Sequence, residues 1–255
     1  MAEDPKRALK ASYEQLYTDV GLVDDSRVYR WIVKLLQPQP RQKLLDVACG
    51  EGLIIREALK RTPEAYGLDI AEAAVRKASR HAVGGGFTVG DAEALPFPSD
   101  TFDYVTCLGS LENMPDPWKA IVEIRRVTKE QGLICILVPN MFWLEDVCLA
   151  WFRQREDRPF QPFERRATRS GWRNFLLAHG LLVEQELRYN KPAVLFRGGK
   201  LKSLRKFLVS SALNLFTPFN LSLNFVYLCR KARFTPIANE DYWIWEARQS
   251  WLRGS

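Results

Sequence analysis

The sequence predicts an α/β fold built on a doubly wound, mostly parallel sheet of seven strands. Short apolar runs alternate with stretches of helical periodicity, and strands separated in this way are joined by right-handed crossovers that make neighbours parallel. With 255 residues, 47% of them hydrophobic, the chain is long enough for one such domain with an added cap. The expected strands are 43–48, 65–70, 86–90, 102–109, 133–139, 181–189 and 221–230.

The expected helices divide the chain into three parts. An N-terminal helical cap (1–40), helical over about 5–37, is followed by the main domain (41–231) and a C-terminal tail (232–255) whose tryptophans are expected to pack on the domain or on a second subunit. Two long inserts, 140–168 and 190–220, interrupt the main domain and are expected to build a cap, because connections of that length commonly form lids or binding surfaces. Within the domain, helices are expected at 53–61, 71–81, 117–128 and 169–179.

Cysteine usage and the N-terminus point to a reducing compartment. The five cysteines are odd in number and lack a Cys-x-x-Cys pair, which favours buried thiols over disulfides or a metal site. The opening residues, MAEDPKRALKASYEQL, have no apolar stretch after their charges, so no secretory signal is expected. A cytoplasmic location follows as the expectation.

The most informative stretch is LLDVACGEG (44–52), a strand that ends in a turn of small residues. A dinucleotide loop needs a third glycine where this chain has Ile55, and a Walker loop needs a Gly-Lys-Ser/Thr sequence that is missing here. Both phosphate-binding interpretations are therefore disfavoured, and with them a nicotinamide-linked enzyme.

Acidic residues mark the carboxyl ends of three successive expected strands. Asp46 precedes the small-residue turn, Asp69 ends the second strand, and Asp91 follows the third. Ligands of such sheets bind at this edge. Asp69 can accept two ribose hydroxyls and Asp91, beside Ala92, can read an adenine edge, so the arrangement suits a nucleoside with a positive centre.

Three motifs in order resemble those of the class I S-adenosylmethionine-dependent methyltransferases, in the subgroup that includes quinone-biosynthesis and sugar methyltransferases. They are LLDVACGEG, YGLDIAEAAV and the segment from GDAEALPF to LVPN, and the resemblance is close over about residues 40–140. It implies a Rossmann-like sheet with an antiparallel last strand, and S-adenosyl-L-methionine as cofactor. The family usually has glycine at position 48, and paired histidines where this chain has Glu112 and Asn113.

Carried over residue by residue, the resemblance implies a cofactor site. Gly50 and Gly52 would shape the pocket for the methionine part, Asp69 would bind the ribose, and Ile70 would pack on the adenine. Glu112 is the candidate for contact with the acceptor, with a capping or solvated carboxylate as the alternative. The implied cofactor-binding residues are Asp46, Ala48, Gly50, Gly52, Asp69, Ile70, Asp91, Ala92, Leu108 and Gly109.

Methyl transfer from a sulfonium is an in-line displacement, so alignment of the reactants can supply most of the catalysis and a strong base is optional. Both histidines, His81 and His179, lie at expected helix ends and are assigned structural roles. Tyr13 and Tyr17, four residues apart on the N-terminal helix, either close over the cofactor or pack against the domain.

The net charge of +7 is concentrated in one segment. From Arg188 to Lys206 there are seven basic residues and no acidic one, and 200–216 has the pattern of an amphipathic helix. Cations in its first turns oppose the helix dipole, which suggests an anionic partner such as lipid head groups or an anionic acceptor. A solvated helix packed on the domain is the alternative. Pro218 disfavours a membrane-spanning helix over 207–229.

These observations together predict a methyltransferase acting on a small or amphiphilic, anionic acceptor, either lipid-like or a natural-product or sugar metabolite. A second hypothesis is a non-catalytic module that binds S-adenosylmethionine. A third is an RNA methyltransferase, which is disfavoured because GSLENMPDP (109–117) lacks the Asn/Asp-Pro-Pro-aromatic sequence of amino-methylating nucleic-acid enzymes. The oligomeric state is left open.

Overall fold

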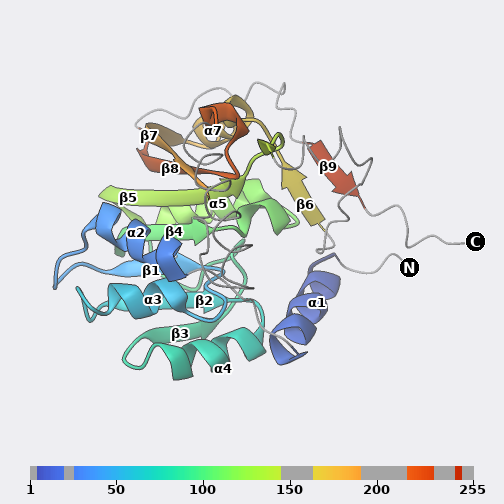
Figure 1. Ribbon diagram of the computed structural model, residues 1–255. Coiled ribbons are helices and arrows are strands. Elements are labelled where there is room, and N and C mark those ends of the chain that lie inside the picture. The colour runs from blue at the N-terminus through green and yellow to red at the C-terminus, as the bar shows by residue number, and fades with distance from the viewer. Residues whose placement is uncertain (1–4, 20–25, 145–162, 191–216, 233–244, 249–255) are drawn as a thin grey trace, which may run out of the picture.

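Seven strands form one sheet, in the order β3-β2-β1-β4-β5-β8-β7 (Figure 1). A computed structural model of the chain describes residues 5–19, 26–144, 163–190, 217–232 and 245–248. The strands are β1 (Leu44–Val47), β2 (Ala65–Asp69), β3 (Gly86–Val89), β4 (Phe102–Leu108), β5 (Thr128–Pro139), β7 (Leu181–Tyr189) and β8 (Asn224–Lys231).

The pairing confirms the predicted sheet. β1, β2, β3, β4 and β5 are mutually parallel, whereas β8, the last of the seven along the chain, runs antiparallel to β5 and β7. The order of the strands in the sheet reverses direction between β1 and β4. The helix that follows β1, α3 (Leu53–Ala58), packs on one face of the sheet, and the helix that follows β4, α5 (Pro117–Val127), packs on the other. A crevice forms at the carboxyl ends of the strands at such a reversal, and it is the usual ligand site of an open α/β sheet.

Helices cover both faces of the sheet (Figure 1). The side chains of α2 and α3 pack on one face and those of α5 and α7 on the other, while α4 contacts β2 and β3. The N-terminal region forms two helices, of which α1 packs against α4, beyond the carboxyl ends of the strands. The helices are α1 (Pro5–Asp19), α2 (Ser26–Leu36), α3 (Leu53–Ala58), α4 (Glu72–His81), α5 (Pro117–Val127) and α7 (Arg169–Ala178), with the 3₁₀ turns η1 (Leu111–Asn113) and η2 (Phe219–Leu221).

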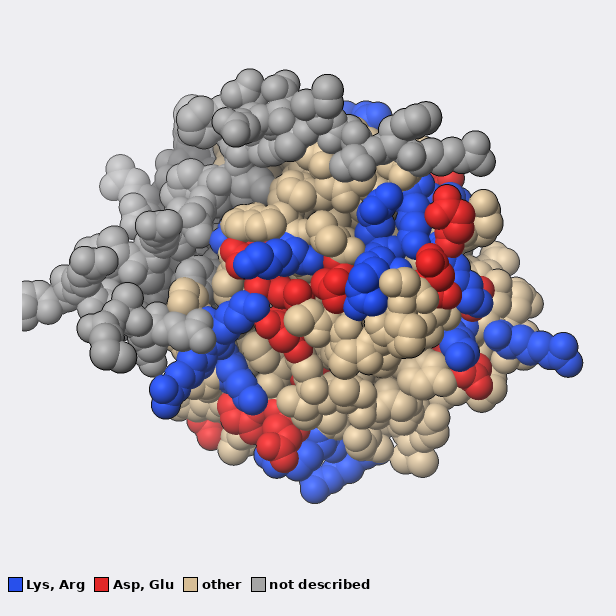
Figure 2. Space-filling view, turned by 180° about the vertical axis from the view of Figure 1, so that it is seen from behind, with Lys and Arg blue, Asp and Glu red and all other residues tan. Residues whose placement is uncertain are grey.

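Most of the basic segment lies outside the described residues, together with the helix expected at 200–216. Arg188 is its one described member, and its guanidinium donates to the carbonyl of Thr217. Figure 2 shows Lys and Arg side chains interspersed with Asp and Glu side chains over the described part of one face. None of the helices described is long and apolar enough to cross a membrane.

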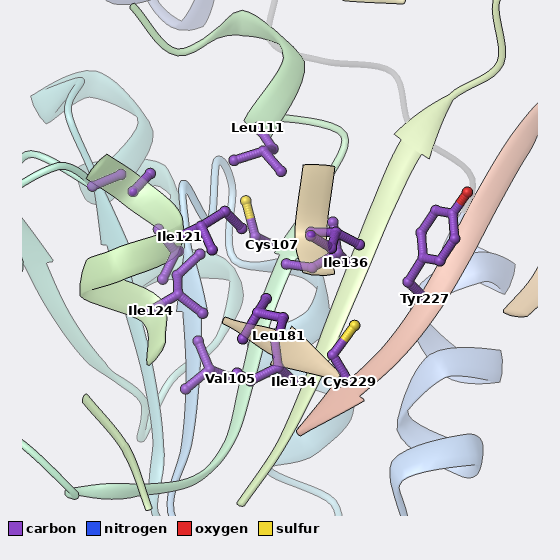
Figure 3. Packing of buried hydrophobic residues seen from close by; sticks show 14 of the residues in the cluster. Val105, Cys107, Leu111, Ile121, Ile124, Ile134, Ile136, Leu181, Tyr227 and Cys229 are labelled. Atoms are coloured by element: carbon purple, nitrogen blue, oxygen red, sulfur yellow. The ribbon is translucent and has the colours of Figure 1, made fainter. Parts of the chain in front are cut away.

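The core on the α5 side shows why these residues form a layered fold (Figure 3). Ile121 and Ile124, three residues apart on one face of α5, pack with Val105 of β4 and Ile134 of β5, and all four are fully buried. Each buried side chain of this size contributes about 1.5–3 kcal/mol. On the opposite face Ile55, in α3, is fully buried in the second cluster.

A second, two-stranded sheet was not predicted. β6 (Phe163–Arg166) pairs antiparallel with β9 (Trp245–Arg248), so the insert 140–168 is joined by backbone hydrogen bonds to the C-terminal tail. The sequences FERR and WEAR are short and charged, and they give little strand signal. Trp243 and Trp251 lie outside the described residues, as do the insert segments 145–162 and 191–216.

Candidate functional site

The turn after β1 is built from residues with left-handed backbone conformations. Every residue of β1 is buried, and the chain then passes through Ala48, Gly50 and Gly52, whose φ angles are 59°, 50° and 72°. Gly52 caps the N-terminus of α3. Glycine adopts this conformation freely, whereas alanine at position 48 carries a cost of about 1–2 kcal/mol. The turn therefore exposes backbone at the crevice between β1 and β4.

Asp69 fastens this turn to the end of β2. Its Oδ2 accepts a hydrogen bond of 2.9 Å from the Gly50 N–H, and its Oδ1 accepts one of 2.9 Å from the Ala71 N–H. The side chain is buried, and burial raises the pKa of the carboxyl above its usual value, although the backbone hydrogen bonds oppose that shift. Asp69 and the adjacent Ile70 line a cavity.

Asp46, on β1, is a second buried carboxyl at the same edge. Burial raises its pKa to about 7, against the opposing effect of a hydrogen bond from Thr106. The Thr106 hydroxyl donates this bond to Oδ1 over 2.6 Å. A carboxyl held near pH 7 in this way gains strongly from a cationic ligand beside it.

Asp91, after β3, is engaged by α1. Its Oδ1 accepts from the Glu93 N–H at 2.8 Å, and its Oδ2 accepts from the Lys6 ammonium at 2.6 Å. Ala92 is buried next to it. The structure thus brings the three sequence-predicted acids to one edge and adds a lysine from a distant helix.

Two cavities lie along this edge and share Tyr17, Ala48, Gly109 and Ser110 in their walls. The smaller, of about 80 Å³, lies at the ends of β2 and β3 under α1, and its other lining residues include Lys6, Asp69, Ile70, Asp91, Ala92, Glu93 and Asn113. The larger, of about 230 Å³, extends past β4 toward β5, β7 and β8, and its other lining residues include Tyr29, Asp46, Gly50, Leu108, Leu137, Tyr189 and Asn224.

Tyr13 and Tyr17 of α1 both face the smaller cavity. Their rings stack with centroids 6.2 Å apart, and Tyr17 is buried. A β-carbon at Gly50 would lie 2.6 Å from the Tyr17 hydroxyl, so that this ring lies over the turn after β1. Helix α1 therefore covers the smaller cavity and the turn after β1.

Glu112 and Asn113 occupy different positions relative to the cavities. Glu112 is buried in η1 near the Cys107 thiol and is not among the residues that line either cavity. Asn113 lines the smaller cavity and is 3% exposed. Its Nδ2 faces the Gly109 carbonyl at 3.5 Å, whereas its Oδ1 has no hydrogen-bond partner among the described residues.

Sequence reasoning missed Lys6, Tyr189 and Asn224 as cavity residues, whereas Ser110 belongs to the stretch 109–112 that the resemblance placed beside the sulfonium and the acceptor. Tyr189 and Asn224 lie at the end of β7 and the start of β8, which the antiparallel pairing brings to the same edge as the end of β5. The predicted strands carried that signal, because the carboxyl end of one strand and the start of its antiparallel neighbour always meet.

Comparison with known proteins identifies one domain of the chain. A protein-family model described as "Methyltransferase domain" matches residues 45–136. The demethylmenaquinone methyltransferase of Bacillus subtilis (strain 168) is 29% identical over 153 residues, which are 56% of this chain and 66% of the relative. Residues 45–136 of the chain therefore form a methyltransferase domain, and the relatives that the chain matches are named as methyltransferases.

Further relatives agree with this assignment. The 2-methyl-6-phytyl-1,4-hydroquinone methyltransferase 2 of Oryza sativa subsp. japonica is 31% identical over 160 residues, 55% of this chain and 45% of the relative. The aligned part thus spans about half to two thirds of these relatives. In fold, the methyltransferase is similar to the YcgJ protein of Bacillus subtilis (TM-score 0.55, 22% identity, 82% and 100% of the two chains) and to the [4+2]-cyclase SpnF (0.62, 17%, 91% and 98%).

The residues of this methyltransferase fit S-adenosylmethionine, which carries a sulfonium and an ammonium. Among the described residues that line the cavities, five are carboxylates and one, Lys6, is a cation. The bare Cα of Gly50 lets the Tyr17 hydroxyl lie against the turn, where a side chain would clash with it. The five acids are Asp46, Glu51, Asp69, Asp91 and Glu93.

The two histidines of the methyltransferase lie away from this site. His179 ends α7, where its Nδ1 is 2.7 Å from the Phe175 carbonyl. His81 ends α4 with its Nδ1 3.5 Å from a Glu51 carboxylate oxygen. Neither is among the residues that line these two cavities. The four described cysteines are buried free thiols.

Proposed function

We propose that the protein transfers a methyl group from S-adenosylmethionine to a small amphiphilic acceptor with a hydroquinone-like aromatic head. The observation that carries this proposal is the wall of the larger cavity beyond Ser110. Tyr29, Leu137 and Tyr189 make that wall aromatic and apolar, with Asn224 as a polar group at its edge. Apolar lining with a few placed polar groups is typical of sites for flat organic ligands. The names of the relatives, which act on quinone-like molecules, support the same class.

The cofactor is assigned across both cavities. Asp69 would bind the ribose hydroxyls, with Ile70 packing on the adenine and Asp91 and Ala92 at its edge. Asp46 would hold the ammonium of the methionine part, because a buried carboxyl gains most from a cation. Gly50, Gly52 and Ala48 would offer backbone groups to the same part, and Leu108 and Gly109 would flank the sulfonium where the cavities meet.

The chain's contribution to the reaction is orientation. The bound cofactor supplies a methyl group activated by its positive sulfur. Ser110 lies where the two cavities join, so a ring held against Tyr29 and Tyr189 would reach that point from the opposite side to the adenosyl part. Alignment of this kind can supply about 7–11 kcal/mol of the barrier, which leaves little need for a strong base. The contact of Glu112, a residue of η1, with the acceptor stays a prediction.

The amphiphilic character of the acceptor has support from the sequence. An anionic or lipid-like tail would match the basic segment and the pattern of 200–216. Against RNA as the acceptor, the described part of the face in Figure 2 has charges of both signs intermixed rather than a basic stripe.

The experiment is methyl transfer from labelled S-adenosylmethionine to three acceptors offered separately: a demethylmenaquinol, a host extract of polar metabolites, and total RNA. The control variant is Asp69→Asn, which we expect to abolish transfer with every acceptor by losing cofactor binding. Label on the quinol, extracted into organic solvent, supports the proposal. Label only in polar metabolites or RNA overturns the acceptor class, and tight cofactor binding without any transfer favours the non-catalytic module.

A further inference from the structure

The ammonium of Lys6 bridges two carboxylates in the wall of the smaller cavity. Its Nζ lies 2.6 Å from Asp91 Oδ2 and 2.6 Å from Glu93 Oε2. Lys6 belongs to the first turns of α1, whereas both acids follow β3. The bridge therefore ties a helix from one end of the sequence to the strand end where the adenine is assigned.

The two acids differ in how firmly they are held. The Glu93 side chain is 2% exposed, and its Oε1 accepts a hydrogen bond of 2.8 Å from the Asp116 N–H. The Asp91 side chain is 32% exposed and turns toward the cavity. Glu93 is thus a fixed partner for Lys6, and Asp91 is a partner that a ligand can reach.

The charge of Lys6 is secure between these acids. Burial alone would lower the pKa of the ammonium, but the hydrogen bonds to Asp91 and Glu93 outweigh it and raise that pKa. Removal of the lysine would leave the buried Glu93 carboxylate without this cation, which is costly in a low-dielectric site.

The opposite end of α1 is anchored separately. The Glu14 carboxylate accepts from the Ala73 N–H at the start of α4, at 3.1 and 3.3 Å, and lies 3.4 Å from the Arg76 guanidinium. Leu9 and Tyr13, between the two anchors, line the cavity. The helix is consequently a wall of this cavity, fixed at both ends.

We infer that Lys6 and Glu93 are cofactor-retaining residues: their ion pair keeps α1 over the adenosyl part of the cofactor while Asp91 exchanges its bond with Lys6 for one with the ligand. The inference rests on the proposed placement of the cofactor in the smaller cavity. Because Lys6 has a second acceptor, the exchange leaves its ammonium paired with Glu93. Lys6 acts through α1 and is a positioning residue.

The test is the dissociation rate of S-adenosylhomocysteine, measured by stopped-flow displacement. We expect Lys6→Met to raise this rate at least tenfold, and Glu93→Gln, which keeps the oxygen that accepts from Asp116, to raise it similarly. The double variant should be no faster than either single one, because both remove the same ion pair. Lys10→Met, an exposed lysine of the same helix, should leave the rate unchanged.

Hydrogen exchange of residues 5–19 separates this inference from the proposed function. Without any ligand, α1 amides should exchange faster in Lys6→Met than in the wild type or Lys10→Met. An unchanged dissociation rate together with unchanged exchange overturns the role of Lys6, and additive effects of the two substitutions overturn the pairing. If the wild-type protein fails to bind S-adenosylhomocysteine, the proposed function fails, and the exchange of α1 still decides whether the ion pair holds the helix.

Discussion

The hydroxyl of Tyr17 lies directly over Gly50, where a β-carbon would approach it to 2.6 Å. Gly50 also has a φ of 50°, so an alanine there meets both a clash and an unfavourable backbone conformation. We expect Gly50→Ala to lower the free energy of unfolding by more than the roughly 1–2 kcal/mol that the backbone conformation alone costs, measured by urea denaturation.

The double variant Gly50→Ala/Tyr17→Phe divides that cost into its two sources. Removing the hydroxyl relieves the clash but leaves the backbone cost, so part of the lost stability should return. If Gly50→Ala is as stable as the wild type, Tyr17 does not lie over this turn.

Ala48→Gly should stabilise the protein, an unusual direction for a substitution to glycine. Ala48 has a φ of 59°, a conformation that costs an alanine about 1–2 kcal/mol, and the flexibility of glycine in the unfolded chain offsets part of the gain. The expected net gain is about 0.5–1 kcal/mol in chemical denaturation. The matched control, Ala73→Gly in α4, should lose about 0.5–1 kcal/mol, and equal losses in both variants would contradict the left-handed assignment.

Cofactor binding should depend on pH through Asp46. Its pKa of about 7 in the free protein means that the carboxyl is partly protonated at neutral pH. A ligand ammonium favours the ionised form, so the affinity for S-adenosylhomocysteine should rise from pH 6 to 8 and then level off. Titration calorimetry should also show proton release on binding at pH 6. Asp46→Asn should bind more weakly with a flat profile, and a variant profile as steep as that of the wild type would assign the effect elsewhere.

The same carboxyl makes the free energy of unfolding depend on pH. Its pKa is raised from 3.8 to about 7 on folding, so between these pH values the native state binds more protons than the unfolded state. The contribution of Asp46 to the free energy of unfolding therefore falls as pH rises through this window. Asp46→Asn removes that contribution, which thermal unfolding at pH 5 and pH 8 can measure.

Asn113 lines the smaller cavity, where the adenosyl part of the cofactor is assigned, and its Oδ1 faces no partner in the described part of the chain. Its Nδ2 is the atom that can donate to the Gly109 carbonyl, which fixes the orientation of the amide. We expect Asn113→Ala to raise Kd for the cofactor about tenfold, the equivalent of one hydrogen bond of about 1.4 kcal/mol. A raised KM for a quinol acceptor with an unchanged Kd for the cofactor would assign the oxygen to the acceptor instead.

Glu112→Gln provides the contrasting case. The carboxyl lies in η1 outside the cavity walls, and the sequence-based hypothesis gives it contact with the acceptor. That hypothesis expects a slower turnover with intact cofactor binding. A variant with an unaffected rate would remove Glu112 from the reaction.

The parts of the fold that were predictable are those with a strong apolar pattern. Ile55 was interpreted as incompatible with a dinucleotide loop, and it lies in α3 with its side chain fully buried. The start of β5 was predicted at residue 133 but lies at Thr128. The stretch TKEQG (128–132) is polar and its Glu130 and Gln131 are exposed, so hydropathy does not mark it as a strand. At its start, the Thr128 hydroxyl bonds back to the Ile124 carbonyl and the chain turns extended at once.

The position of a candidate site residue was predictable where the residue lies at or just after the carboxyl end of a strand. It was not predictable where the residue is held by a contact between distant parts of the sequence. Asp46, Asp69 and Asp91 were found because strand ends converge at one edge. The bridge of Lys6 to Asp91 joins residues 85 positions apart, and no local pattern encodes it. Arg165 of β6 is similar: its buried guanidinium donates to the carbonyls of Met114 and Pro115 in the cavity wall.

The antiparallel pairing of β8 with β5 and β7 brings a second segment of the chain to the site. Residues assigned to the cofactor between β1 and β4 come from the segment that matches the family model, whereas Tyr189 and Asn224 enter the larger cavity from β7 and β8, beyond it. The segment that carries β7 and β8 can therefore be replaced while the segment that holds the assigned cofactor residues is kept. Chimeras joined after Pro139, where β5 ends, would carry one donor's cofactor affinity with the other donor's choice of acceptor.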